Sequence, residues 1–173
     1  MDGVLTDDER RVVSAAYQLG LILSSHWPDL AAHLLAQGAD GESVAELAGL
    51  SRTASPWVVD QLVPNLLSEL AIPELSSSEA GDLVARLLGQ VAATTPAADK
   101  YAVIRKLARM SADLDYPSGV IGDAYSASEW LDCKCHANSP ERDAAVVLEN
   151  VLRASEPLNI NAGLLLAVGA AWV

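Results

Sequence analysis

Apolar residues recur every three or four positions along almost the whole chain, and this spacing predicts helices. The first predicted helix covers residues 7–25, with Thr6 as its N-cap and three acids in its first turn. The other predicted helices cover residues 28–38, 42–48, 56–70, 76–94, 99–114, 128–135 and 139–152. Pro64 lies inside one of them and is expected to kink or split it.

No segment alternates apolar and polar residues with the period of two that marks a half-buried strand. We therefore predict an all-α fold, a compact bundle of about seven to nine short helices with mostly antiparallel neighbours. A length of 173 residues with 51% apolar content is typical of one domain with a substantial core. The predicted domain covers residues 1–173.

The C-terminal segment 157–173 carries no charge and is the most apolar stretch of the chain. It is shorter than the about 20 apolar residues needed to span a bilayer, and two Asn and two Gly interrupt it. We expect it to pack on the domain as a core element, and we predict no membrane partner. The alternative is an apolar surface for self-association, which would make the protein a homo-oligomer.

The chain holds 23 acidic and 11 basic residues, a net charge of −12. Such a surface repels nucleic acid and anionic lipid, and it steers encounters with basic partners. The cysteines, Cys133 and Cys135, are too close in sequence for an unstrained disulfide, which favours a reducing compartment. Residues 1–11 lack the pattern of a secretory signal. We therefore expect a cytoplasmic protein.

Cys133, Cys135 and His136 form the sharpest local cluster of chemistry-bearing residues, with Glu129 one turn earlier. Cys and His suit zinc, but a structural zinc site needs four ligands and usually brings them in two separated pairs. No second pair exists, because His26 and His33 are separated by a Trp-Pro break. We predict no metal and no cofactor, and a role for the three residues stays open.

The sequence shows no motif of nucleophilic catalysis, since no Gly-x-Ser-x-Gly elbow and no Cys/His signature is present. The many carboxylates are typical of a solvated acidic surface. We therefore predict that the protein is not an enzyme.

Residues 43–52, followed by 58–70, partly fit a helix-turn-helix motif. However, the sequence words AELA and GLS abut, and Pro56 and Trp57 stand where a recognition helix should present polar contacts. Acids outnumber the single base Arg52 between residues 42 and 74, which opposes the phosphate contacts that supply most non-specific DNA affinity. We predict no nucleic-acid partner.

Residues 111–132 carry five acids and no base, interleaved with aromatic residues. Aromatic side chains beside carboxylates suit a surface that docks a basic protein, because the rings anchor and the charges steer. The predicted partner-binding residues are Asp113, Asp115, Tyr116, Asp123, Tyr125, Glu129, Trp130 and Asp132. The alternatives are that the rings pack into the core while the acids face water, or that the basic cluster at 100–109 pairs with the acids.

Two passages, residues 34–50 with 67–70 and residues 114–117, resemble small helical bacterial proteins of uncharacterised families. Some of those proteins resemble immunity proteins, which neutralise toxins of neighbouring cells. A composition rich in Ala, Leu and Asp is similar to that of high-GC actinobacteria. The resemblance implies an acidic, helical binding protein and transfers no functional residue.

The leading hypothesis is an acidic protein-binding module, of which an immunity-type inhibitor of a basic toxin protein is one form. One alternative is a helical enzyme or small-molecule binder with a core cavity, with Glu129, Cys133 and His136 at its mouth. Another is a self-associating structural protein that uses its apolar C-terminal segment.

Overall fold

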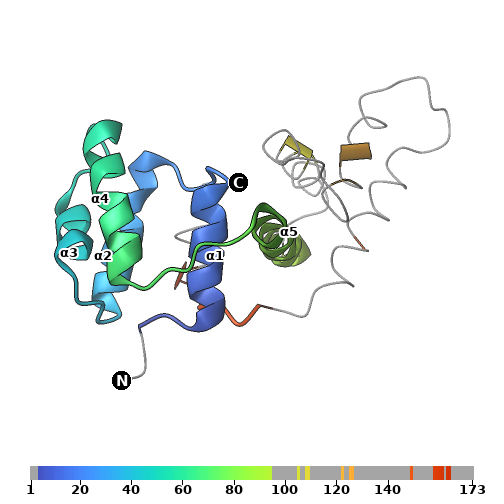
Figure 1. Cartoon of the computed structure of the whole chain (residues 1–173), viewed down its shortest axis with the longest axis horizontal. Helices are drawn as coiled ribbons and strands as arrows, with labels where there is room; N and C mark the ends of the chain where they lie inside the picture. Colours follow the sequence, from blue (N-terminus) through green and yellow to red (C-terminus); the bar gives the residue numbers. More distant parts are fainter. Residues whose placement is uncertain are drawn as a thin grey trace. The chain divides into compact units, whose positions relative to one another are not determined.

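The computed structural model describes residues 4–94, 105, 108–109, 122, 125–126, 149, 158–161 and 163–164. All continuous regular structure in this part of the chain is helical (Figure 1). The elements are α1 (Asp7–Gln18), the 3-10 turn η1 (Ser24–His26), α2 (Trp27–Ala36), α3 (Glu42–Gly49), α4 (Pro56–Glu69) and α5 (Ser77–Thr94). The helical class is confirmed for these residues. The predicted helices over 99–114, 128–135 and 139–152 lie almost entirely outside them.

The chain divides into two compact units. The first comprises Met1–Leu75 with Asn159–Val173, and the second comprises Ser76–Leu158. Helices α1 to α4 belong to the first unit and α5 to the second. The single domain over residues 1–173 stays a prediction.

Helix α1 begins with a capping box, in which the Thr6 hydroxyl accepts the N–H of Glu9 and the Glu9 carboxylate accepts the N–H of Thr6. The helix ends at Gln18, so the prediction that it continues to residue 25 was wrong. Gly20 has a φ of +63°, and the N–H of Leu21 donates to the carbonyl of Ala16 at 2.8 Å. This Schellman motif ends the helix because its left-handed residue cannot continue the α-helical ladder.

Helices α2, α3 and α4 are consecutive in sequence and in space. Helix α2 packs against α3, α3 packs against α4, and η1 contacts both α2 and α4. The bounds of α2 and α3 lie close to the predicted ones. The large side chains that are almost fully buried in these three helices are Trp27, Leu30, Leu34, Val44, Leu47, Val59, Val63 and Leu66.

Helix α4 runs past Pro64 without dividing there, although the sequence analysis allowed a split. Proline removes one backbone donor from the ladder. The neighbouring Val63 and Leu66 are buried, and their packing holds the backbone on both sides of the proline in the helix. Beyond Leu70, Ala71 adopts a φ of +51°, which turns the chain away from the helix axis.

In the second unit, α5 also starts with a capping box, between Ser76 and Glu79. Its buried face includes Leu83, Val84 and Leu87. The side chain of Gln90 donates to the carbonyl of Leu158 at 3.2 Å.

In the first unit, the described residues of the C-terminal segment lie beside α1 and α2. The backbone N–H of Asn161 donates to the Glu9 carboxylate at 2.8 Å, and the Gly163 backbone lies against the His33 ring. Leu164 is 1% exposed. Residues 165–173 lie outside the described part, so the packing of the whole segment stays a prediction.

Candidate protein-binding surface

Most of the predicted partner-binding residues fall outside the described residues. Tyr125 is described, and its side chain is 48% exposed, as a docking residue would be. The other seven lie outside: Asp113, Asp115, Tyr116, Asp123, Glu129, Trp130 and Asp132. The cluster of Cys133, Cys135 and His136 lies outside as well.

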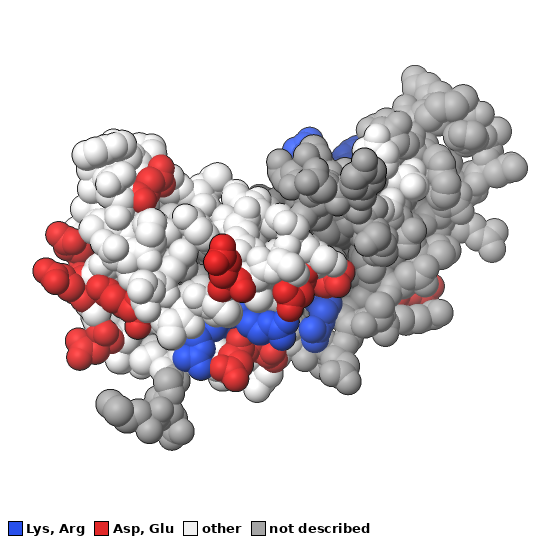
Figure 2. Space-filling view, in the orientation of Figure 1, with Lys and Arg blue, Asp and Glu red and all other residues white. Residues whose placement is uncertain are grey.

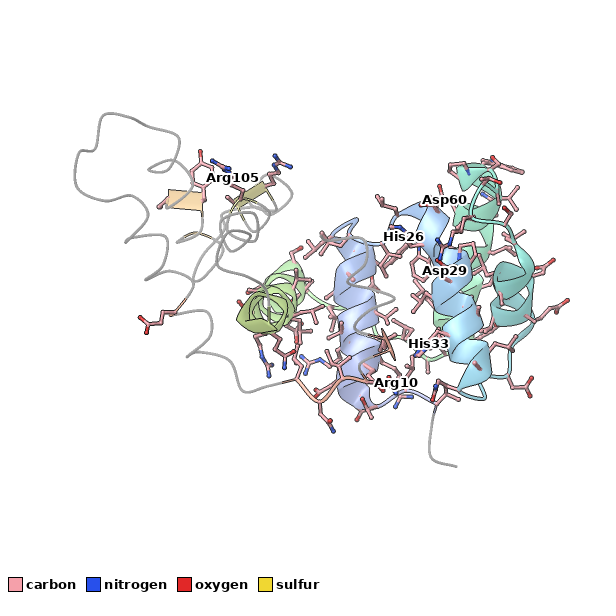
Figure 3. The ribbon with its side chains drawn as sticks, turned by 180° about the vertical axis from the view of Figure 1, so that it is seen from behind. Arg10, His26, Asp29, His33, Asp60 and Arg105 are labelled. Carbon is pink, nitrogen blue, oxygen red and sulfur yellow. The ribbon has the colours of Figure 1, made fainter. Side chains whose placement is uncertain are left out.

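Two histidines considered as ligands are described, and both are half-buried. His26 precedes α2, whereas His33 lies near its C-terminal end and faces Gly163. Figure 3 shows them toward opposite ends of this group of helices. Among the described residues, no three His, Cys, Asp or Glu side chains gather to hold a metal ion.

The clearest surface feature of the first unit is the outer face of α4. Its inner face is a narrow stripe formed by Val59, Val63 and Leu66, all 1% exposed or less. The exposed positions along the helix are Pro56, Trp57, Val58, Asp60, Gln61, Pro64, Asn65, Ser68 and Glu69. Helix α4 holds no Lys and no Arg. Its outer face is therefore apolar at the N-terminal end and acidic or neutral elsewhere.

Trp57 is the largest apolar side chain on this face, and it is 70% exposed. The other described tryptophan, Trp27, is 2% exposed and stacks edge-on against Tyr17 at a ring-centroid distance of 5.9 Å. The fold thus uses one indole in its core and leaves the other in water. Trp is enriched among the residues that dominate the energy of protein interfaces, because it buries a large area on binding.

Asp60 lies one turn beyond Trp57, on the same side of the helix. Its Oδ1 accepts a hydrogen bond from the Ser24 hydroxyl at 3.2 Å, which ties α4 to η1. Leu23, next to Ser24, is 54% exposed. Exposed apolar side chains therefore occur on α4 and immediately before η1, the two elements that this hydrogen bond joins.

A second aspartate lies at the same end of the helices. Asp29 of α2 forms an ion pair with Arg52 of the α3–α4 turn, with 2.8 Å between Nε and Oδ2. Figure 3 shows Asp29 and Asp60 at one end of the group, together with His26. Arg52 is the only Lys or Arg between residues 27 and 75, and this pair neutralises it.

Acidic side chains extend over the neighbouring helix α3 and the residues just before it. Glu42 and Glu46 of α3, and Asp40 before it, are all exposed. In Figure 2 the red side chains over α3 stand without blue neighbours, whereas red and blue side chains mix along the lower middle of the view. This surface favours a positively charged partner.

Glu69, at the far end of α4, fixes α4 to the start of α3. Its carboxylate accepts the backbone N–H of Ser43 at 3.1 Å and that of Val44 at 3.3 Å. These bonds, that of Ser43 first, hold the pKa of Glu69 below its ordinary value. Gly41 leaves the space for this carboxylate, since a Cβ there would overlap it. An anion at a helix N-terminus is stabilised by the free N–H groups.

From the sequence, Trp57 was interpreted only as a residue that disfavours DNA binding. One signal was present: Trp57 and Val58 lie outside the stripe of residues 59, 63 and 66 that the helical period assigns to the core. Position 57 in α4 is where a recognition helix would need polar or basic contacts, and the absence of a nucleic-acid partner stays a prediction.

No family model, curated protein or solved structure matches this chain. In the part of the chain that the structure describes, no helix combines the length and apolar character that crossing a membrane requires.

Proposed function

We propose that the chain is an acidic protein-binding module, and that a basic protein docks on the outer face of α4. The observation that carries the proposal is the exposed indole of Trp57, one helical turn before the exposed Asp60 on the same helix. The proposal assigns no catalysis to the chain, and it sets the encounter in the cytoplasm.

The indole of Trp57 contributes little to the stability of the fold. A largely exposed tryptophan contributes little burial to its own fold, since hydrophobic stabilisation scales with the apolar area removed from water. A partner that covers it would recover that burial. Val58 and Leu23, both exposed, enlarge the area available to a partner.

Charge supports a basic partner over a neutral one. The surface around α4 carries Asp60 and the exposed acids of α3, and Arg52 is neutralised by Asp29. Complementary charge speeds association and fixes orientation more than it adds affinity. The acidic, aromatic residues of 111–132, which belong to the second unit, stay proposed partner-binding residues in their own right.

In its narrowest form, the proposal is that the partner is a basic toxin and the chain is its immunity-type inhibitor. This form rests on the resemblance of residues 34–50, 67–70 and 114–117 to small helical bacterial proteins, and on the net charge of −12.

The test uses the full chain as bait beside its Trp57→Ser variant. Proteins retained by the first and not by the second are identified by mass spectrometry, purified and measured for association at increasing salt. We expect a partner of positive net charge whose association rate falls steeply with salt. A salt-independent rate, or an acidic partner, would contradict the proposal.

A charge-neutralised variant examines the acidic residues of 111–132. With Asp113, Asp115 and Asp123 replaced by Asn, we expect slower association and a flatter salt dependence. An unchanged association rate would show that residues 111–132 do not take part in binding and would leave α4 as the proposed binding surface.

A further inference from the structure

Trp57 and Asp60 are neighbours on the surface of α4 by their spacing along the helix. They lie three residues apart on α4, which puts their Cβ atoms about 5–6 Å from each other on one side of the helix. The indole is 70% exposed, and the carboxylate is also exposed. The Ser24 hydroxyl bonds to Oδ1 of Asp60, which restrains the carboxylate and leaves Oδ2 for another donor.

Among the described residues, the bases near this end of the helices leave Asp60 without a paired Lys or Arg. Arg52 pairs with Asp29. Among the described residues, no Lys or Arg lies within ion-pair distance of Asp60. The guanidinium of Arg52 thus pairs with Asp29, whereas Asp60 stays available to a cation of a partner, on the same side of α4 as the exposed Trp57.

A guanidinium fits this pair better than an ammonium does. It is planar, so it stacks on an indole while its edge donates hydrogen bonds to a carboxylate. A lysine ammonium is a compact, strongly hydrated charge that cannot stack. We propose that Trp57 and Asp60 together receive one arginine side chain of the basic partner, stacked on the indole and bonded to the carboxylate. This inference rests on the proposed function and specifies the group that is recognised.

The experiment compares two synthetic helical peptides that are identical except that every basic residue is arginine in one and lysine in the other. Each carries a fluorophore, and affinity for the full chain is measured by fluorescence anisotropy. The indole N–H resonance of Trp57, assigned with Trp57→Phe, reports contact at the pair. We expect the arginine peptide to bind about 2- to 30-fold more tightly, and to shift that resonance.

Three variants and two controls locate the preference. Trp57→Ala is expected to abolish it, and Asp60→Asn is expected to reduce it. The double variant should lose little more than the worse single variant, because one guanidinium uses both groups. The controls are Glu46→Gln, which removes an exposed carboxylate from α3, and Leu35→Ala, which trims an exposed apolar side chain on α2. Both controls should keep the arginine preference.

Several results would overturn the inference. Equal affinity for the two peptides would do so while leaving the proposed function standing, provided that binding is salt-sensitive. An equal loss in Glu46→Gln and Asp60→Asn would show a diffuse acidic field in place of a defined pair. Absence of binding by both peptides, together with no basic protein retained by the full chain, would refute the inference and the proposed function together. Circular dichroism of each variant checks that the helices are intact.

Discussion

Helices α1 and α4 use their apolar residues in opposite ways. In α1, the five consecutive residues 12–16 are all buried, so the middle of this helix has no solvent side. In α4, only Val59, Val63 and Leu66 are buried, while Trp57 and Val58 are exposed. The comparison teaches that α1 is committed to the core, whereas α4 carries apolar side chains that its own fold does not bury.

Their carboxylates differ in the same way. Glu9 of α1 is buried and accepts hydrogen bonds from the Thr6 backbone and hydroxyl and from the Asn161 backbone. Burial alone raises the pKa of Glu9, but these bonds, aided by the charge of His33, lower it below the ordinary value. Asp60 of α4 is exposed and bonds to one hydroxyl. The α1 carboxylate organises the fold, and the α4 carboxylate faces solvent.

The largest expected effect comes from placing a charge on each helix. Val13→Asp puts an unpaired carboxylate at a fully buried site and should cost about 4 kcal/mol or more of unfolding free energy. The matched change Val58→Asp, on the exposed face of α4, should cost about 0.5 kcal/mol or less. Urea unfolding followed by circular dichroism measures both. Similar losses in the two variants would break the contrast between the helices.

A smaller effect is expected from Glu9→Gln, which removes the negative charge but keeps the side-chain volume. The charged hydrogen bonds to Thr6 and Asn161 weaken, and the free energy of unfolding should fall by about 1–3 kcal/mol at neutral pH. Because the folded pKa of Glu9 is lowered, its ionisation stabilises the protein above the ordinary carboxyl pKa, and this contribution is lost as pH falls through the folded pKa.

Unfolding measured from neutral to acid pH should therefore show a shallower decline in Glu9→Gln than in the natural chain. Glu42→Gln, an exposed carboxylate on α3, is the control and should keep the natural slope. Parallel pH curves for Glu9→Gln and the natural chain would show that Glu9 does not hold the C-terminal segment as described.

A still smaller effect is expected at the C-terminal end of α4, where Glu69 lies. Glu69→Gln should lower the free energy of unfolding by about 0.5–1 kcal/mol, because it removes the negative charge that accepts hydrogen bonds at the N-terminus of α3. The pKa of Glu69 is also lowered, so this contribution is present above the ordinary carboxyl pKa and disappears in acid. Thermal unfolding at neutral and acid pH measures it. A loss that persists equally in acid would mean that the ionised carboxylate is not the stabilising group.

Local signals in the sequence predicted most of the described helices, and they failed where tertiary contacts decide. Thr6 as N-cap, followed by three acids, marked the start of α1 correctly, because capping acts within the first turn. The end of α1 was missed because apolar residues after Gly20 continue the helical period, while the left-handed Gly20 overrides it.

The candidate site shows the same limit. The contacts of Glu9 with Asn161 and of Glu69 with Ser43 join residues 152 and 26 positions apart, and no local pattern announces them. The exposure of Trp57 depends on which face of α4 meets α3, so the sequence placed the indole in a helix but did not show that it faces water.

The central claim is that Trp57 serves binding and not folding, and Trp57→Ala tests it most directly. The measurement pairs the affinity for the purified basic partner with the free energy of urea unfolding of the same variant. The account predicts a loss of about 2 kcal/mol or more in binding, as for interface hot spots, and a change of about 0.5 kcal/mol or less in unfolding. Undiminished binding, or a large loss of stability, would contradict it.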